Sequence, residues 1–575
     1  MVSSKESTRI AFGSCNNQNL TNNLWDNMAK RNPQAFVWAG DAIYAGEIVL
    51  LAACSIHIIF ICFYVVHGAT YSSSLSFSHP HSCAPLRSPA DIHLGNDWST
   101  FPPTPIMSQA TPERLKAFYK SQLNDPSYQM FLRTTNTTVL GTIDDHDMGM
   151  NNGDETYEFK QQSGVQFLEF IGEDRSNVMF QRAMSGHGVY GVKVFDFDNS
   201  RNGDHLLSDE EAGIDPDVVG YDIEMKNSPR EYKEKRVAIF VLDARTNRSP
   251  WGKGFDAWKR NYSGDFLGER QWNWFETALL KSNAAVNIVV NGLQVHPFRH
   301  PNANTAEQWA QFPTSRQRLY DAILKGGARA PLLISGDVHM AQLMRKDCWL
   351  RNDQSSLARP LIEFTTSGMT HSWGSVFASS QKFHDTWKYY PMHVMSKTIM
   401  TVAHWVFPMP DLMISGTTPP NNDDDSTLFE NGGAEGSKQG QQYSLDKNFG
   451  ELEIDWVQKS IAIRAFGEDS TAPPLLSASF SMDQLSGLEP IPGAIRDIQS
   501  LQDRGGFLVD GNIIKGSESV CVNHRGTANN AHFLIGMVAM TLVLSFFLLG
   551  PQFLLVRFIL KRWKSIKRDR TGYNV

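Results

Sequence analysis

Four short groups of residues in this sequence carry side chains that bind metal ions in proteins. They are 13–15 (GSC), 40–44 (GDAIY), 144–147 (DDHD) and 335–339 (SGDVH). Each group directly follows a short hydrophobic run, and such a run predicts a β-strand. Because ligand sites in α/β sheets form at the carboxyl ends of the strands, we expect these side chains to converge there. The sequence therefore predicts a metal site at one edge of a sheet.

Each group alone has a plainer interpretation. Gly-Asp after a strand is usually a turn, and an isolated cysteine such as Cys15 is more often a small buried hydrophobic residue than a ligand. The run 144–147 resists this interpretation, because its three carboxylates and one imidazole repel one another unless cations compensate them. All four groups occur after strands of one chain, which favours a metal site.

The residue types suit two metal ions. Asp41 could bridge two cations, while the Tyr44 phenolate and the Cys15 thiolate suit iron and carboxylates suit calcium, magnesium or manganese. Two neighbouring metal ions ionise a water molecule and neutralise a phosphoryl group. His146 would then be free to protonate the leaving alkoxide as general acid. The expected ligands are Cys15, Asp41, Tyr44, Asp145, Asp337 and His339.

The elements that must position these groups alternate between short β-branched or aromatic runs and helical stretches, which is typical of an α/β fold. We expect strands at 9–12, 35–38, 139–142, 237–242, 287–291, 331–334 and 361–365 and a closing strand pair at 450–455 and 460–466. We expect helices at 112–123, 268–282 and 314–325. The polar run 419–441 predicts a flexible loop.

These motifs resemble those of the alkaline phosphatase D (PhoD-like) family of the calcineurin-like metallophosphoesterase superfamily. The superfamily order of GD, GNH(D/E) and GHxH is matched by GDAIY, DDHD and SGDVH, and the fragments FGSC, LDART, GERQWNWFETAL and EFTTSG also fit the family. The resemblance covers about residues 9–466, apart from a block at 47–90. It implies a four-layer α/β/β/α metallophosphoesterase sandwich.

The resemblance also implies roles for individual residues. The six ligands named above would hold an iron-plus-calcium site of two or more metal ions, with other divalent metals as alternatives and Asp144 as a further ligand. His146 matches the catalytic histidine of the superfamily. Arg245 and Arg248 follow the LDART run and would clamp phosphate bidentately, with a solvent-exposed ion pair as the equal alternative. This sequence departs from the family at Ile143, where the family often has a tryptophan. A further metal ligand would lie near Gln294 and His296.

The expected function is therefore that of a metal-dependent phosphoesterase acting on phosphate mono- or diesters. A metal-bound hydroxide would attack phosphorus in line, without a covalent serine intermediate. The alternative is a catalytically impaired, membrane-tethered binding protein that keeps the fold. The block 47–90 separates the two hypotheses, because it follows Tyr44 closely and could displace it. We interpret this block as an insertion, with a second membrane helix at 48–66 as the alternative.

A membrane anchor is expected near the C-terminus. Residues 533–556 carry no charge and are long enough to cross a hydrocarbon core of about 30 Å. Seven basic residues and one acidic residue follow before position 571, which predicts a cytoplasmic tail. The expected organisation is a phosphatase domain at 1–475, a stalk at 476–531, a transmembrane helix at 532–557 and a basic cytoplasmic tail at 558–575.

The single-pass topology places the catalytic domain in a lumenal or extracellular space. The first nine residues have no apolar signal-peptide core, so a truncated start or a tail-anchored protein with a cytosolic domain are the alternatives. Net charge is −7 and the sequence pI is about 6.2, values that do not indicate nucleic-acid binding. The six cysteines include no CxxC pair, so no zinc knuckle or redox motif is indicated.

Overall fold

The structure is a computed structural model of the chain. It describes residues 7–45, 96–97, 104–105, 109–198, 205–221, 231–253, 255–297, 307–351, 357–375, 389–406, 442–491, 516–523, 535–536, 538–543, 545–546, 557 and 561.

The first of two large sheets contains the N-terminal strand and joins parallel to antiparallel pairing. Strands β1, β2 and β5 run parallel, and β13, β14 and β15 extend the sheet in antiparallel fashion beside β1. The strand order is β15 (Leu476–Ser481), β14 (Ser460–Phe466), β13 (Phe449–Asp455), β1 (Ser7–Gly13), β2 (Ala35–Ala39) and β5 (Thr138–Thr142).

The second sheet has four neighbouring parallel strands, β11, β9, β8 and β7, with antiparallel strands on both sides. Its order is β12 (Tyr443–Ser444), β10 (Ala341–Leu350), β11 (Arg359–Thr366), β9 (Pro331–Ser335), β8 (Ala284–Val290), β7 (Lys233–Val241) and β6 (Gly191–Asp196), and β16 (Ser519–Asn523) also pairs with β10. The short strands β3 (Asn96–Asp97) and β4 (Thr104–Pro105) pair separately.

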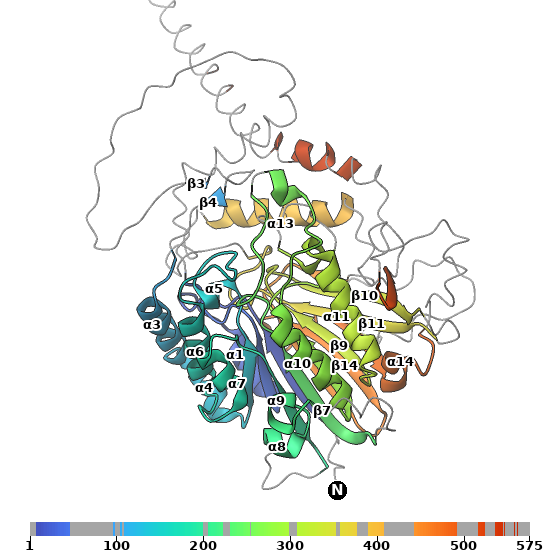
Figure 1. Cartoon of the computed structure of the whole chain (residues 1–575). Coiled ribbons are helices and arrows are strands. Elements are labelled where there is room, and N and C mark those ends of the chain that lie inside the picture. The colour runs from blue at the N-terminus through green and yellow to red at the C-terminus, as the bar shows by residue number, and fades with distance from the viewer. Residues whose placement is uncertain are drawn as a thin grey trace, which may run out of the picture.

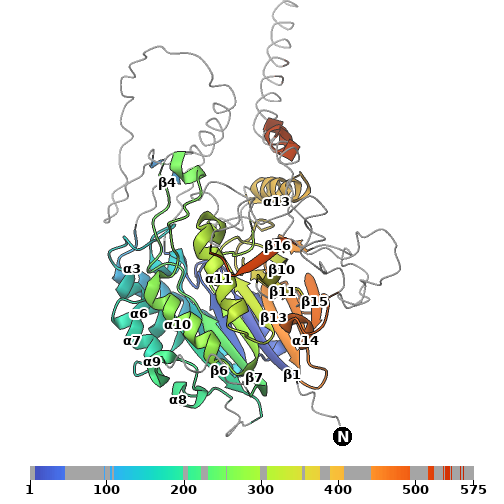
Figure 2. The same ribbon diagram turned by 45° about the vertical axis from the view of Figure 1, so that its right-hand side comes forward.

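Helices cover the outer sides of both sheets, so that the molecule has four layers (Figures 1 and 2). Beside the first sheet lie α1 (Leu24–Arg31), α3 (Pro112–Leu123), α4 (Pro126–Thr134), α6 (Lys160–Ile171) and α7 (Val178–Met184). Beside the second lie α10 (Gly268–Lys281) and α11 (Pro313–Lys325). Shorter helices are α5 (Asp145–Met148), α8 (Asp209–Ala212), α9 (Pro216–Val219), α14 (Met482–Ser486), η2 (Phe255–Trp258) and η3 (Trp309–Gln311). The expected α/β fold is confirmed, with two sheets.

Strand β7 shows why the second sheet is hydrophobic on both faces. Val237, Ile239 and Val241 join the cluster shared with the first sheet, whereas Ala238 and Phe240 join the cluster under α10 and α11. Successive side chains of a strand point to opposite faces, and a sheet covered on both faces needs apolar residues at every position. A continuous apolar run therefore becomes a central strand.

The strands expected from the sequence and the helices expected at 112–123, 268–282 and 314–325 are all present, most of them with shifted ends. Helix α3 begins at Pro112 and ends at Leu123, as expected, because Thr111 accepts a hydrogen bond from the Arg114 amide and proline suits the first helical turn. Strand β7 begins at Lys233, four residues before the expected start at 237. Its early residues are polar and mostly exposed, so hydrophobicity gave no sign of them.

The folded body continues into the segment 476–531, for which we expect a stalk. Strand β15 adds to the edge of the first sheet, with Leu476, Ala478 and Phe480 buried. Strand β16 pairs with β10, and a disulfide joins Cys348 to Cys521 across that pair. The boundary at 475 is therefore too early, because two short strands follow it that only their long-range partners reveal.

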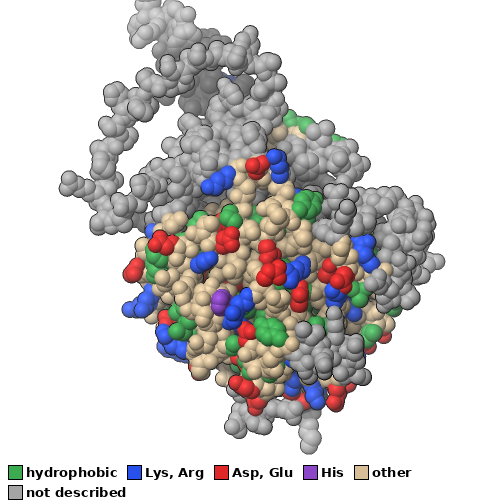
Figure 3. Space-filling model, in the orientation of Figure 1, with side chains coloured by type: hydrophobic (Ala, Val, Ile, Leu, Met, Phe, Trp, Pro, Cys, Tyr) green, Lys and Arg blue, Asp and Glu red, His purple; other side chains and the backbone are tan. Residues whose placement is uncertain are grey.

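The described part of the chain contains no helix that is long and apolar enough to cross a membrane. Most of the expected membrane helix at 532–557 lies outside the described residues, as do the loop 419–441 and the whole block 47–90. Those expectations stay predictions. On the face shown in Figure 3, acidic and basic side chains are interspersed.

Candidate metal centre

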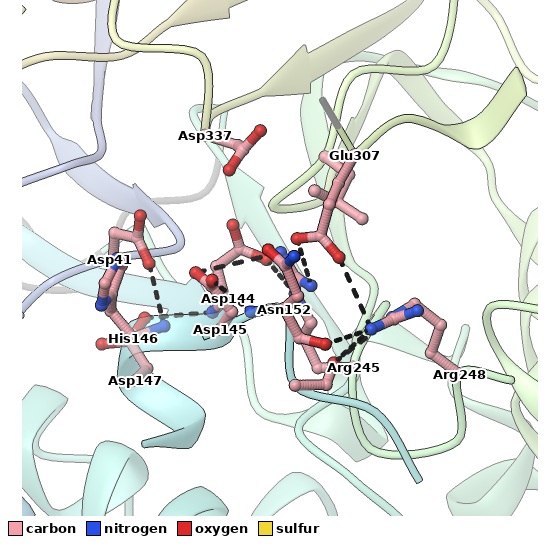
Figure 4. Close-up of polar contacts among 12 residues, drawn as sticks. Asp41, Asp144, Asp145, His146, Asp147, Asn152, Arg245, Arg248, Glu307 and Asp337 are labelled. Carbon is pink, nitrogen blue, oxygen red and sulfur yellow. Dashed lines mark hydrogen bonds and ion pairs between the residues drawn. The ribbon is translucent and has the colours of Figure 1, made fainter. Parts of the chain in front are cut away.

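The four groups singled out from the sequence follow four strands that end on the same side of the molecule. Cys15 follows β1, Asp41 and Tyr44 follow β2, the run 144–147 overlaps the short helix α5 after β5, and the run 335–339 follows β9. Parallel pairing of β1, β2 and β5 explains the meeting of the first three groups. The second sheet supplies the fourth from across the sandwich (Figure 4).

Two overlapping sets of side chains have ligand atoms close enough to share a metal ion. Asp41, Asp145 and His146 form one set, with all three atoms within 4.8 Å of one another. Asp144, Asp145 and Asp337 form the other, within the same distance. Asp145 belongs to both sets, so the geometry favours Asp145 as the shared ligand, whereas the sequence suggests Asp41.

Cys15, Tyr44 and His339 lie on the Asp41 side of the centre. The Tyr44 hydroxyl donates to Asp41 Oδ2 at 3.2 Å and lies 3.5 Å from His339 Nε2. The Cys15 Sγ lies 3.5 Å from the same Asp41 oxygen and 3.0 Å from Ser367 Oγ. Tyr44 is thus in place at the site although the block 47–90 follows it closely.

The backbone is strained at four of the expected ligands. Cys15, Asp41, Asp337 and His339 have φ angles of 58°, 51°, 68° and 55°, in the left-handed region that non-glycine residues rarely adopt. Such residues cluster at functional sites, where the surrounding structure holds them in place. The strain here accompanies the turning of each side chain toward the centre.

Two glycines allow close approach of neighbouring backbone and side chains at the centre. A Cβ atom at Gly336 would lie 2.4 Å from the Ala39 carbonyl oxygen and 2.5 Å from Ser14 Oγ. Gly40 has a φ of 83°, and a Cβ atom there would lie 2.4 Å from Asp144 Cβ. The glycine of each Gly-Asp motif therefore serves close approach as well as the turn.

More negative than positive charge is buried at the centre. Arg245 and Arg248 are the guanidinium groups drawn there (Figure 4). Six carboxyl groups gather at the same place, of which five are buried and that of Asp337 is partly buried: Asp41, Asp144, Asp145, Asp147, Glu307 and Asp337. Buried charges must be paired or bound to metal. The surplus of carboxylates fits a site for cations.

The pKa values of the aspartates at the centre are consistent with this surplus of buried carboxylates. Burial, only partly offset by Arg245, raises the pKa of Asp144 to about 7, and burial raises the pKa of Asp147 to about 7. Burial and neighbouring acids also raise the pKa values of Asp41 and Asp337 well above the ordinary range. For Asp145, burial is outweighed by His146 and Arg245, and the pKa falls to about 2. Cations at the centre would let all these groups ionise.

Arg245 and Arg248 lie in a buried network behind the acidic cluster. The Arg245 guanidinium pairs with Asp144 through Nε and with Glu307 through Nη1 at 2.7 Å. Arg248 Nη2 lies 3.5 Å from Glu307 Oε1 and donates to the Asn152 carbonyl at 2.5 Å. The backbone amide of Asn152 in turn donates to Asp145 Oδ2 at 2.8 Å. The solvent-exposed ion pair considered for the two arginines is wrong, because both side chains are fully buried.

The Asp147 carboxylate accepts hydrogen bonds from other groups of the protein. Its Oδ1 accepts from the Ala42 amide and the Tyr119 hydroxyl, both at 3.1 Å, and its Oδ2 accepts from the Asp144 amide at 3.0 Å. These bonds tie α5 to the loop after β2. Asp147 thus positions the two groups of ligands relative to each other.

The His146 ring lies against Tyr44, with ring centroids 3.9 Å apart. The sequence did not single out His371, a buried residue whose ring centroid is 4.6 Å from those of Tyr44 and His339. His371 follows β11, the next strand beside β9, so its place after a strand was an available signal. Glu307 follows no expected strand, and its approach depends on tertiary structure.

Gln294 and His296 lie outside the centre, contrary to the hypothesis of a further ligand there. The two ring nitrogens of His296 contact the Tyr320 hydroxyl at 3.1 Å and the Leu361 carbonyl at 2.9 Å. Gln294 Nε2 donates to Gln342 and Thr365, at 2.8 Å in both cases. Both side chains thus bond to groups of the second sheet and, for His296, also of α11, and burial lowers the pKa of His296 well below its usual range.

The chain is similar to two solved structures at low sequence identity. Among solved structures, the chain is similar to "Structure of PhoD" at 12% identity, covering 88% of this chain and 73% of that one with a TM-score of 0.45. It is also similar to "GAP50 the anchor in the inner membrane complex of Plasmodium" at 9% identity, covering 84% and 96% with a TM-score of 0.32. No curated protein sequence matches the chain.

Residues 234–397 match the family model described as PhoD-like phosphatase. This region runs from β7 into α13 (Tyr389–Val406) and includes Arg245, Asp337 and His339. The match confirms the resemblance to the alkaline phosphatase D family that the motifs indicated, and residues 234–397 are the part of the chain that is similar to this family.

Proposed function

We propose that this protein is a metal-dependent phosphoesterase that hydrolyses phosphate mono- or diesters. The observation that carries the proposal is the pair of ligand sets that share Asp145 amid a surplus of buried carboxylates. The family match over residues 234–397 supports the choice of phosphoester chemistry.

The donor types indicate which residues would hold the metals. Cys15, Tyr44 and Asp41 supply thiolate, phenolate and carboxylate donors, a set that suits iron, with His339 beside them. Asp144 and Asp337 supply hard carboxylate oxygens that suit calcium. Bound metal ions of this kind ionise water and neutralise phosphoryl charge. Asp145 would contribute to both positions.

His146 is the proposed general acid. Its ring is held between Tyr44 and the carboxylates of Asp41 and Asp145, so its orientation is restricted before substrate binds. A fixed imidazole beside the reacting group can give its proton to the leaving alkoxide. The proposed phosphate clamp by Arg245 would require its guanidinium to exchange Asp144 or Glu307 for a phosphate oxygen, since both hold it in this structure.

We further propose that residues 532–557 anchor the protein in a membrane, with the basic tail in the cytoplasm. The catalytic part would then face a lumenal or extracellular space. The Cys348–Cys521 disulfide supports this location, because disulfides persist in oxidising compartments and are rare in the cytosol.

The alternative function is that of a tethered binding protein without catalysis. The position of Tyr44 at the centre favours the enzyme, because displacement of this side chain was the feature that would favour the alternative.

Assay of the chelated full-length chain, before and after addition of iron and calcium, tests the enzyme directly. We expect hydrolysis of p-nitrophenyl phosphate or bis-p-nitrophenyl phosphate only after metal is restored. Asp41→Asn, prepared in the same way, should stay inactive. Hydrolysis that survives chelation, or a metal-loaded wild-type chain that cleaves neither ester, would contradict the proposal.

A further inference from the structure

Helix α13 is a largely apolar helix whose described side chains are all at least partly exposed. Its sequence, YYPMHVMSKTIMTVAHWV, contains one lysine and no acidic residue. Of the side chains described in it, 393–404, none is buried, and Val394 is 40% exposed. By contrast, α10 buries Trp272, Trp274, Phe275 and other residues against the second sheet. An amphipathic helix of a soluble domain normally packs its apolar stripe on a core, so α13 is unusual in this fold.

Contacts tie α13 to the rim of the metal centre. The Ser396 hydroxyl donates to the Trp373 carbonyl at 3.0 Å, and the Trp373 indole donates to the Val338 carbonyl at 2.9 Å. Val338 lies between Asp337 and His339, the two expected ligands from the second sheet. Trp373 therefore links α13 to the loop that presents these ligands.

The far end of α13 is held equally well. The His404 ring stacks on Tyr443 at a centroid distance of 3.7 Å, and its Nε2 lies 3.1 Å from Gln342 Nε2. Lys397 forms an ion pair of 3.4 Å with Asp446 between the two ends. The helix is thus held at both ends against the folded body, while its described apolar residues stay partly exposed and Val394 is exposed.

A second apolar stretch lies beside it. In Figures 1 and 2, the helical residues among 535–546 lie next to α13, at the end of the molecule where α5 also lies. Ile535, Val538, Leu542 and Phe546 are 61%, 55%, 67% and 72% exposed. They belong to the uncharged stretch 533–556, which a basic cluster follows.

We propose that α13 lies flat on the headgroup layer of the lipid bilayer that residues 533–556 enter, which places the rim of the metal centre at the membrane surface. This inference rests on the proposed membrane anchor. Helix α13 is not apolar enough to span a bilayer, and it combines apolar residues with Lys397, two tyrosines and a tryptophan but no acidic residue. Lysine, tyrosine and tryptophan side chains favour the interface between headgroups and acyl chains. The phosphoesters nearest the centre would then be those of lipid headgroups.

Photo-crosslinking tests the position of α13. The full-length chain would be reconstituted in phosphatidylcholine vesicles that contain a photoactivatable phosphatidylcholine, and the labelled peptides identified by mass spectrometry. We expect lipid adducts within 389–406 as well as within 533–556. The change Val394→Glu should reduce the adducts on α13 several-fold, because it places a charge in the interface.

Val457→Glu is the matched control. Val457 is 73% exposed in the turn between β13 and β14, and strand register places this turn beyond Ser7, at the opposite end of β1 from Cys15. The same substitution there should leave the adducts on α13 unchanged.

Three results would overturn the proposal. They are adducts on 533–556 without any on 389–406, adducts on neither segment, and crosslinks from α13 to a second copy of the chain instead of lipid. Only the second result would also remove the proposed anchor. Hydrolysis of soluble p-nitrophenyl phosphate by the same preparations reports separately on the proposed activity. Val394→Glu should leave that hydrolysis unchanged but slow the hydrolysis of phosphatidic acid in the vesicles several-fold.

Discussion

At the scale of single residues, the expected ligands must be ionised to bind cations, but burial disfavours their ionised forms. Asp41 and Asp337 have left-handed backbones and pKa values raised mainly by burial, whereas Asp145 has a pKa of about 2. Asp145 is therefore already a carboxylate when the metals are absent. Its place in both ligand sets makes it the natural first point of contact for a cation.

His146 and Asp41 should have separable effects. His146 belongs to one of the two ligand sets, but the proposed ligands Cys15, Asp41, Tyr44, Asp145 and His339 all remain in His146→Ala. We therefore expect this variant to keep its metal content and to slow turnover by roughly 10²–10⁴-fold, the usual contribution of general acid catalysis. The loss should be smaller for nitrophenyl esters, whose leaving groups need no proton, than for alkyl esters. Asp41→Asn should lose both metal and activity. Equal losses on both kinds of ester for His146→Ala would argue against the acid role.

Arg245 should matter first for folding. Its removal in Arg245→Ala leaves the buried Asp144 without its arginine and leaves Glu307 with Arg248 alone as its cationic partner. Breaking a buried ion pair typically costs about 3–5 kcal/mol. Urea unfolding of the chain should show this loss, with Arg245→Lys retaining part of the stability. If Arg245→Ala leaves the free energy of unfolding unchanged and raises KM instead, Arg245 acts as the phosphate clamp expected from the sequence.

The convergence of the ligands was predictable because every expected ligand directly follows a strand, and the ends of parallel strands are brought together by the sheet. Arg245 was also identified, but its burial was not, since that depends on Glu307 and Asp144. Glu307 escaped prediction because it follows no expected strand and a single acid carries no signal in the sequence. His371 does follow an expected strand, but a single histidine there was too weak a signal to identify it.

At the scale of elements, β16 is joined to the fold by a covalent bond and by pairing with β10. The bond closes a loop of 173 residues in sequence separation. Such elements cannot be found from local sequence, because the strand is short and its partner distant. The central strands were found because burial on both faces makes them largely apolar, as β2 is throughout and β8 is apart from Asn287.

Replacing both cysteines, in Cys348→Ser/Cys521→Ser, should reduce the free energy of unfolding by about 2–4 kcal/mol, the usual contribution of a disulfide. Thermal unfolding with and without reductant would measure this effect. Reductant should lower the Tm of the wild-type chain but leave that of the double variant unchanged. A wild-type Tm insensitive to reductant, with both thiols shown to be reduced, would contradict the structural role of the bond.

At the scale of the whole molecule, stability should depend on metal and pH together. In the metal-free chain, Asp144 and Asp147 have pKa values of about 7, above the value of about 4 for unfolded aspartate. The folded state then binds more protons than the unfolded state between these values, so its stability falls as pH rises from about 4 to 7. Bound cations favour the ionised carboxylates and should remove this loss.

Thermal unfolding of chelated and metal-loaded chains across this pH range checks the prediction. The difference in Tm between the two forms should grow as pH rises toward 7. The lowered pKa of Asp145 acts in the opposite direction, but below pH 4, outside this window. A metal-free chain that becomes more stable between pH 4 and 7 would show that the buried carboxylates are not the groups that metal compensates.

Metal content measured by elemental analysis tests the central claim most directly. Two ligand sets that share Asp145 predict two metal ions per purified wild-type chain, and loss of both in Asp145→Asn. Gln294→Ala, which changes a residue outside the centre, should keep the wild-type content. A wild-type chain that hydrolyses phosphoesters without bound metal, or an Asp145→Asn chain with its full metal content, would contradict the account.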